Sequence, residues 1–161
     1  MLYKCTLLFA TLALLATTSA CNSDFDAEVA FAANYQTTYQ KLHSCKASQH
    51  PAAKYVETWL SPDAKEAWAA YAALPEGSTA TVALPVGAVL VKTQFDDAAC
   101  KELMNFTVME KLAVGAAPTT GDFRWQHVDI DGACLNCDNG NACSSCHTQP
   151  ACRDFVCTKP N

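Results

Sequence analysis

Apolar residues recur at steps of three and four along the segment that follows residue 20, as in the buried stripe of an amphipathic helix. The stripe consists of Phe25, Val29, Ala32, Tyr35, Tyr39 and Leu42. Ser23, with Asp26 three residues further on, is a helix start signal. The pattern therefore predicts a helix over residues 25–42 whose apolar side packs against the rest of the domain.

The next patterned segment, residues 55–60, is rich in β-branched and aromatic side chains and predicts either a strand or a helical turn. Ser61 then has the character of an N-cap, and Pro62 suits the first position of a helix. A second helix is therefore expected to run from here to Pro75. Its inward-facing side chains are Ala64, Ala67, Trp68 and Tyr71.

From residue 79 onward the apolar pattern is typical of strands separated by Pro, Gly and Asp. The expected strands are residues 79–84, 87–95, 103–112 and 123–130. From Gly132 the chain has no periodicity and is rich in cysteine, which predicts a loop. With no internal repeat and no second domain, the pattern predicts one α+β domain over residues 21–161: an antiparallel β-sheet with packed helices and a C-terminal Cys-rich loop.

Composition agrees with a folded domain and excludes one class of partner. Half of the 161 residues are hydrophobic and only 17% are charged, so the chain can bury a sizeable core. It carries 16 Asp and Glu against 11 Lys and Arg, with a net charge of −5 and no basic run. Nucleic acid, whose phosphates require clustered positive charge, is therefore not expected as a partner.

The first twenty residues have the organisation of a signal peptide. Lys4 is followed by an apolar stretch over residues 7–16, and Thr18-Ser19-Ala20 supplies the small residues that precede cleavage. The apolar stretch is too short to cross a bilayer as a helix. We therefore expect an exported protein in an oxidising compartment, the periplasm of a bacterium or its outer membrane.

Cleavage after Ala20 would leave Cys21 at the new N-terminus, as in bacterial lipoproteins. Thr18, however, occupies the position where lipoproteins prefer leucine. Two alternatives stay open: Cys21 carries a lipid anchor, or it is an ordinary thiol of a secreted protein.

The densest chemical signal is the pentapeptide Cys143-Ser144-Ser145-Cys146-His147. It matches the attachment pattern of c-type haem, in which two thiols three residues apart bond the vinyl groups of one porphyrin. The adjacent histidine, His147, then becomes the proximal ligand of the haem iron. The sequence therefore predicts one covalent haem c, held by Cys143, Cys146 and His147.

Two other interpretations of these cysteines compete with haem. Cys134 and Cys137 with Cys143 and Cys146 resemble the ligands of a zinc site, although only five residues separate the two pairs and export disfavours free thiolates. Alternatively, every cysteine belongs to a disulfide, His147 is incidental, and the chain is a disulfide-rich binding domain without haem.

With haem attached and Cys5 removed together with the signal peptide, six of the ten cysteines remain besides Cys21. These six are Cys45, Cys100, Cys134, Cys137, Cys152 and Cys157. Six cysteines allow fifteen pairings, which the sequence does not distinguish. We expect Cys45 to join Cys100 and thereby link the helical region to the sheet, while the other four brace the loop around the haem.

The order of motifs from Tyr55 onward resembles the cytochrome P-460 family, which includes the cytochromes c′-beta. The similarity rests first on Trp59-Leu60-Ser61-Pro62-Asp63, Trp68, Leu84-Pro85-Val86-Gly87-Ala88-Val89-Leu90-Val91-Lys92 and Met109-Glu110-Lys111. It continues through Gly115, Pro118, Gly121-Asp122-Phe123-Arg124-Trp125, the pentapeptide and Arg153-Asp154-Phe155-Val156. The cysteines at 134, 137, 152 and 157 and the first helix have no counterpart in the family pattern.

The resemblance implies a small α+β domain, often a homodimer, with one five-coordinate haem whose distal side is open. In P-460 members a lysine is bonded to the porphyrin edge, and Lys92 is the matching residue; it would otherwise be an ordinary strand lysine or an unlinked equivalent. A carboxylate above the open iron is expected to accept protons in hydroxylamine-oxidising members. The residues available for this are Asp129, Asp131 and Asp138.

These features predict an exported cytochrome that binds or oxidises a small nitrogen compound, hydroxylamine or nitric oxide, and passes electrons to a soluble partner. An open sixth position allows a small molecule to bind the iron, whereas a second strong ligand restricts haem to electron transfer. The alternative is therefore a low-spin electron-transfer cytochrome with Met104, Met109 or His127 as the sixth ligand.

Overall fold

The structure, a computed structural model, describes residues 28–49, 53–75, 78, 80, 83–137, 140–148, 152, 156 and 157. The expected signal peptide, Cys21, and residues 153–155 of the family-like tail lie outside the described residues. Within the described ranges, no helix is long and apolar enough to cross a membrane.

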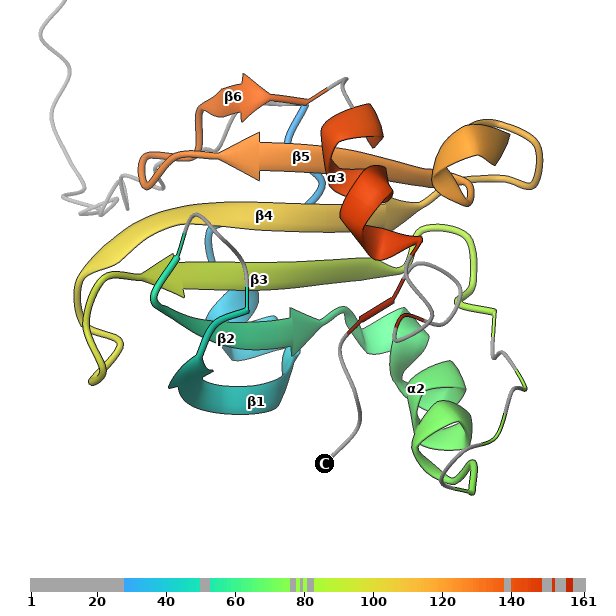
Figure 1. Cartoon of the computed structure of the whole chain (residues 1–161), viewed down its shortest axis with the longest axis horizontal. Coiled ribbons are helices and arrows are strands. Elements are labelled where there is room, and N and C mark those ends of the chain that lie inside the picture. Colours follow the sequence, from blue (N-terminus) through green and yellow to red (C-terminus); the bar gives the residue numbers. More distant parts are fainter. Residues whose placement is uncertain are drawn as a thin grey trace, which may run out of the picture.

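The fold is a six-stranded antiparallel sheet in which every strand pairs with the next one along the chain (Figure 1). The strands are β1 (Gln40–Ala47), β2 (Tyr55–Leu60), β3 (Val89–Phe95), β4 (Leu103–Lys111), β5 (Phe123–Val128) and β6 (Cys134–Asn136). The helices are α1 (Tyr35–Thr38), α2 (Lys65–Ala72) and α3 (Gly140–His147), with the 3-10 turns η1 (Pro62–Ala64) and η2 (Pro118–Thr120). The predicted α+β class is confirmed.

Most of the strand predictions are confirmed. The segments expected as strands at 87–95, 103–112 and 123–130 become β3, β4 and β5, and of the two alternatives for residues 55–60 the strand forms, as β2. The expected strand at 79–84 is wrong where the structure describes it, because residues 80, 83 and 84 are not in a strand. Leu84 is nevertheless buried in the core beside α2, so its apolar character serves packing rather than sheet pairing.

The second helix forms where expected, as η1 followed by α2, with Trp68 buried against the sheet. Ser61 precedes the turn, but its hydroxyl does not cap the helix. It accepts a hydrogen bond of 2.8 Å from the backbone N–H of Val89 instead. Ser61 therefore links the end of β2 to the start of β3.

The predicted helix over 25–42 is wrong over most of its described part, because residues 28–34 form turns and bends and residues 40–42 belong to a strand. Only α1 is helical within its described part, and β1 begins at Gln40 and pairs with β2. Tyr35 is buried, with its ring 5.4 Å from Trp59 and 5.9 Å from Phe106 in edge-on contacts. The aromatic residues thus fill the space against the sheet, and backbone pairing with β2 outweighs helical periodicity. Burial raises the pKa of Tyr35 to about 12.

The two faces of the sheet carry separate cores. One face, called here the helix face, packs against α3, which lies in front of the sheet in Figure 1, and against Trp68 of α2, a helix that follows the end of β2 at the lower right. The opposite face is covered by the segment around α1. Gln126 holds that segment, because its side chain accepts from the N–H of Ala30 at 2.8 Å and donates to the carbonyl oxygen of Glu28 at 2.6 Å.

Candidate functional site

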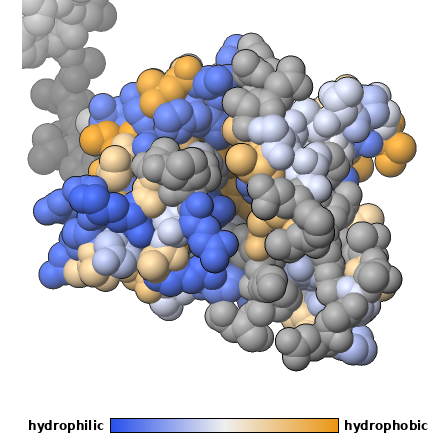
Figure 2. Space-filling model, viewed as in Figure 1, coloured by the Kyte–Doolittle hydropathy of each residue, from blue (hydrophilic) through white to orange (hydrophobic). Residues whose placement is uncertain are grey.

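The helix face of the sheet is divided into an apolar row and a polar row. Side chains of directly opposed residues on neighbouring strands lie on the same face. The strand register places Leu60, Leu90, Met109 and Trp125 in one row, and Thr58, Lys92, Thr107 and His127 in the next. Figure 2 shows hydrophobic atoms exposed in the middle of this face, next to hydrophilic ones. Such a surface suits a ligand with an apolar body and a polar edge.

The prediction of a Cys-rich loop from Gly132 is wrong, because residues 134–136 form β6 and the pentapeptide lies on a helix. Residues 143–147 form the second half of α3, which packs against β5 and η2. Helical spacing of three and four residues brings Cys143, Cys146 and His147 into one turn. Cys143 is half-buried against the helix-face core, while Cys146 is exposed, and both thiols are free. The helix thus presents two thiols and an imidazole beside the apolar row.

His147 contacts the sheet through Trp125. The two ring centroids are 4.5 Å apart, with an interplanar angle of 71°. The indole Nε1 of Trp125 is buried and has no hydrogen-bond partner among the described residues. This places the imidazole at the edge of the apolar row.

The disulfides support the predicted division of the cysteines. Cys45 is bonded to Cys100, as expected, and the other pairs are Cys134–Cys137 and Cys152–Cys157. Cys143 and Cys146 belong to none of them. The alternative in which all cysteines form disulfides is therefore not observed.

The zinc alternative also loses support, because Cys134 and Cys137 are bonded to each other and leave only two thiols of the four-cysteine set. Within the part of the chain that the structure describes, no three His, Cys, Asp or Glu side chains converge on a metal position. Cys143 and Cys146 therefore do not share a four-cysteine site with Cys134 and Cys137.

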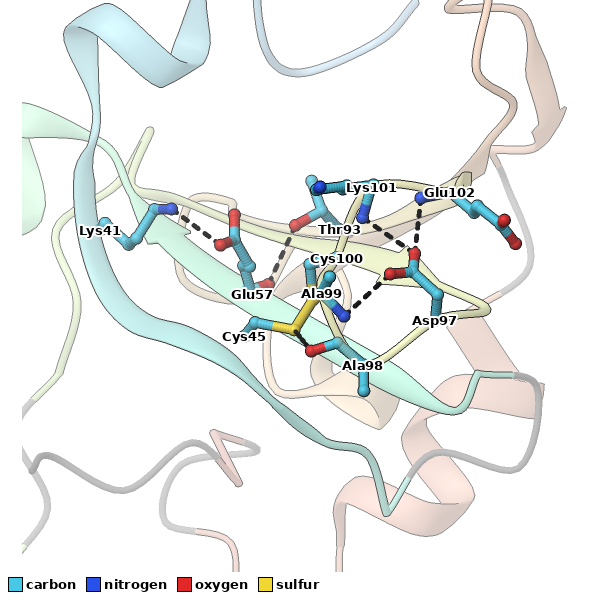
Figure 3. Close-up of a disulfide and its surroundings, with 10 residues drawn as sticks. All are labelled: Lys41, Cys45, Glu57, Thr93, Asp97, Ala98, Ala99, Cys100, Lys101 and Glu102. Carbon is cyan, nitrogen blue, oxygen red and sulfur yellow. Dashed lines mark hydrogen bonds and ion pairs between the residues drawn. A yellow bond between two sulfur atoms is a disulfide. The ribbon is translucent and has the colours of Figure 1, made fainter.

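Figure 3 shows how the Cys45–Cys100 bond is positioned. It joins the edge strand β1 to the loop between β3 and β4, across β2. The carboxylate of Asp97 shapes that loop by accepting the backbone N–H groups of Ala99, Lys101 and Glu102. The bond thus links β1 to a hairpin of the sheet rather than a helical region to it.

The electrostatics of Cys143 distinguish the site from that of a thiol–disulfide oxidoreductase. Burial, and then the nearby Cys146, raise the pKa of Cys143 above its usual value. Reactive CxxC thiols need the opposite shift, because the thiolate is the nucleophile. Cys143 therefore remains a neutral thiol at neutral pH.

Lys92 lies in the polar row, between Thr58 on β2 and Thr107 on β4. Its pKa is lowered, first by burial and then by the positive charge of Lys46. Among the described residues its ammonium has no ion pair and no hydrogen bond. A half-buried cation without a counter-charge is costly and marks this position as a candidate for binding or bonding a ligand.

Of the carboxylates expected to accept protons, the two that the structure describes, Asp129 and Asp131, are not brought to the site. Asp129 accepts the backbone N–H groups of Asp131 and Ala133, at 3.0 and 2.8 Å, and so shapes the turn before β6. Asp131 is exposed, and Asp138 lies outside the described residues.

The expected sixth ligands are divided between surface and sheet. Met104 is 41% exposed. Met109 and His127 share the helix face with Trp125, which contacts His147. Met109 and His127 therefore remain the candidates for a sixth ligand, since they lie on the face that carries the candidate site.

Sequence reasoning missed three polar residues near Lys92. Gln94, which is fully buried, donates through Nε2 to the hydroxyl of Thr107 at 3.2 Å. Its Oε1 and the Oδ1 of Asn105, the residue opposite it on β4, are buried without a hydrogen-bond partner among the described residues. Lys46, on β1, completes the set. Polar residues at every second position of β3, Lys92 and Gln94, were the signal that could have revealed this region.

No model of a known protein family matches the chain, and no curated protein is significantly similar to it in sequence. The function must therefore be argued from the chemistry of the site.

Proposed function

We propose that the protein is an exported mono-haem c-type cytochrome whose cofactor lies against the helix face and whose iron binds or oxidises a small nitrogen compound, hydroxylamine or nitric oxide. One observation carries the proposal: Cys143, Cys146 and His147 lie within one turn of α3, with both thiols free. The other described cysteines are paired in disulfides, which is the division that haem attachment requires.

The residues present fit a haem. Cys143 and Cys146 would hold the porphyrin through thioether bonds, and His147 would bind the iron. Leu90, Met109 and Trp125 of the apolar row, which are buried in the helix-face core, supply apolar side chains against which a flat macrocycle would pack. The buried and unpartnered Nε1 of Trp125 is a donor available to a bound group. When bound, haem supplies an iron that takes up a small ligand and exchanges electrons.

Lys92 is the residue that we propose to lie at the porphyrin edge, either bonded to it as in P-460 members or unlinked. Its lowered pKa favours the neutral amine, which is the nucleophilic form. With Asp129 engaged in its turn, the proposal assigns no carboxylate as the proton acceptor.

A low-spin electron-transfer cytochrome remains the second candidate, favoured by the placement of Met109 and His127 on the face that carries Trp125. A protein side chain at the sixth position would exclude the small ligand. In either case a soluble electron-transfer partner is expected, and a homodimer and a lipid anchor at Cys21 remain proposals.

The test is expression together with the c-type maturation system, followed by the pyridine haemochrome assay and the ferrous spectrum. We expect the purified protein to carry covalent haem. The Cys143→Ser and Cys146→Ser variants should lose it, whereas the neighbouring control Ser145→Ala should keep it. A folded chain without haem overturns the proposal. A strongly red-shifted high-spin band supports the Lys92 bond, an ordinary high-spin band supports nitric oxide binding, and a low-spin spectrum supports electron transfer.

A further inference from the structure

Two lysines lie close together on the polar half of the helix face. Lys46 of β1 is opposite Val56 of β2, and Val56 is opposite Gln94 of β3. Lys46 therefore shares the helix face with Lys92, which lies two residues from Gln94 on β3. The Cys45–Cys100 bond, next to Lys46, anchors this edge of the sheet.

Neither ammonium has a counter-charge among the described residues. Each of the two lysines has a lowered pKa, with burial as the first cause, and the charge of Lys46 acts on Lys92. Three other lysines of the described chain do have partners. Lys41 pairs with Glu57, Lys54 pairs with Asp96, and Lys111 donates to the carbonyl oxygen of Gly121. The ammonium groups of Lys65 and Lys101 also lack a partner among the described residues, but both side chains are exposed. What distinguishes the pair on the helix face is that Lys92 is half-buried with the charge of the exposed Lys46 beside it, so this place would gain from negative charge supplied from outside the protein.

The groups around these lysines have hydrogen-bonding capacity that the protein does not use. The carbonyl oxygens of Gln94 and Asn105 are buried without a partner among the described residues. Leaving a buried polar atom unsatisfied is unfavourable. A lysine ammonium carries three N–H donors, so it can donate to such an oxygen and to an anion at the same time. A lysine that donates to one of these oxygens therefore still has N–H groups left for a bound anion.

We propose that Lys46 and Lys92 form a binding site for a carboxylate group on the polar half of the helix face. The carboxylate belongs either to a propionate of the porphyrin or to a free small acid. The first source would place the acidic edge of the cofactor over the polar row while its body covers the apolar row, and it applies when Lys92 is unlinked and protonated rather than bonded to the porphyrin. The second needs no cofactor, so the site stands whether or not haem is attached.

The first arm of the test uses the haem-free protein and acetate as the probe. Acetate replaces chloride at constant ionic strength, and the side-chain resonances of Lys46 and Lys92 are followed by NMR. A saturable shift of both is expected, weakened about tenfold or more in Lys46→Gln because a charge-assisted hydrogen bond is lost. Lys41→Gln, which alters a lysine already paired with Glu57, should leave the affinity unchanged.

The second arm compares protoporphyrin without iron with its dimethyl ester, which lacks the carboxylates, by quenching of tryptophan fluorescence. If the propionates are the source, protoporphyrin binds at least about tenfold tighter than the ester, and Lys46→Gln removes the difference. If acetate binds, but protoporphyrin and its dimethyl ester bind with equal affinity, the source of the carboxylate is a free acid. The proposal is overturned if neither acetate nor protoporphyrin binding changes in Lys46→Gln and Lys92→Gln variants that unfold as cooperatively as the parent. Failure of haem attachment leaves the acetate result intact, so the two proposals fail separately.

Discussion

The imidazole of His147 packs edge-on against the indole of Trp125, with the ring centroids 4.5 Å apart. This contact joins α3 to β5 and seats one turn of helix, with its two free thiols, on the apolar row of the sheet. Aromatic pairs of this geometry are worth about 0.5–1.5 kcal/mol beyond the area that they bury. The contact therefore fixes where the pentapeptide lies relative to Lys92.

Replacing Trp125 by alanine is expected to lower the free energy of unfolding by roughly 3–5 kcal/mol, because a large buried ring leaves a cavity. The same change should loosen α3 and expose Cys143, whose alkylation in the haem-free protein becomes faster. Denaturant unfolding and timed labelling measure the two effects.

Trp59→Ala is the matched control, since Trp59 is equally buried but lies on the opposite face. It should lower stability by a similar amount while leaving Cys143 as slow to react as in the parent protein. Equal acceleration in both variants would mean that general destabilisation, rather than the contact with His147, explains the labelling.

The two thiols of the pentapeptide should react with alkylating reagents at different rates in the haem-free protein. Cys146 is exposed, whereas Cys143 is half-buried and its pKa is raised by burial and then by Cys146. At neutral pH Cys143 therefore has less thiolate than a cysteine of ordinary pKa. Its alkylation rate should keep rising at pH values above 9, the usual pKa of a cysteine. Mass spectrometry of the labelled peptide over time measures this order, and preferential labelling of Cys143 at neutral pH would contradict it.

Lys92→Met should raise the melting temperature of the haem-free protein at neutral pH by a few degrees. The native state lowers the pKa of Lys92, through burial and then the charge of Lys46, so protonated Lys92 disfavours folding. This penalty is full below the native pKa and disappears as the pH rises towards 10.5, the ordinary value for lysine. His43 and His127 are the other titratable side chains that the register places in this row.

Thermal unfolding at several pH values measures the Lys92 effect. The difference between Lys92→Met and the parent should shrink steadily between neutral pH and pH 10.5. A difference that stays constant over this range would show that methionine acts only through packing.

Removing the Cys45–Cys100 bond with a double alanine variant should lower the free energy of unfolding by about 4 kcal/mol, since the bond closes a loop across 55 residues. Removing Cys152–Cys157, with a separation of only 5 residues, should cost about 2 kcal/mol by the same relation. Denaturant titration of both variants provides the comparison. Equal losses would show that chain entropy is not the main contribution of the longer bond.

The sequence singled out Cys143, Cys146 and His147 from their spacing but placed them in a loop, whereas the structure has them on α3. Cys143, Cys146 and His147 are close together because three- and four-residue steps bring side chains together wherever the backbone is helical. The strands from 87 to 130 followed from apolar alternation and turn residues, and Cys45–Cys100 was the expected pair.

The rest depended on contacts between distant segments. Residues 40–42 end the helical stripe but begin β1, because pairing with β2 satisfies their backbone groups and the aromatic rings of the stripe pack onto the sheet instead. The packing of α3 on Trp125 also required the folded chain, and so did the two lysines on one face. Spacing along a chain determines which residues share a turn or a strand face. Only the register between strands brings Lys46 to the same face as Lys92. Only the folded structure shows that neither lysine has a counter-charge among the described residues.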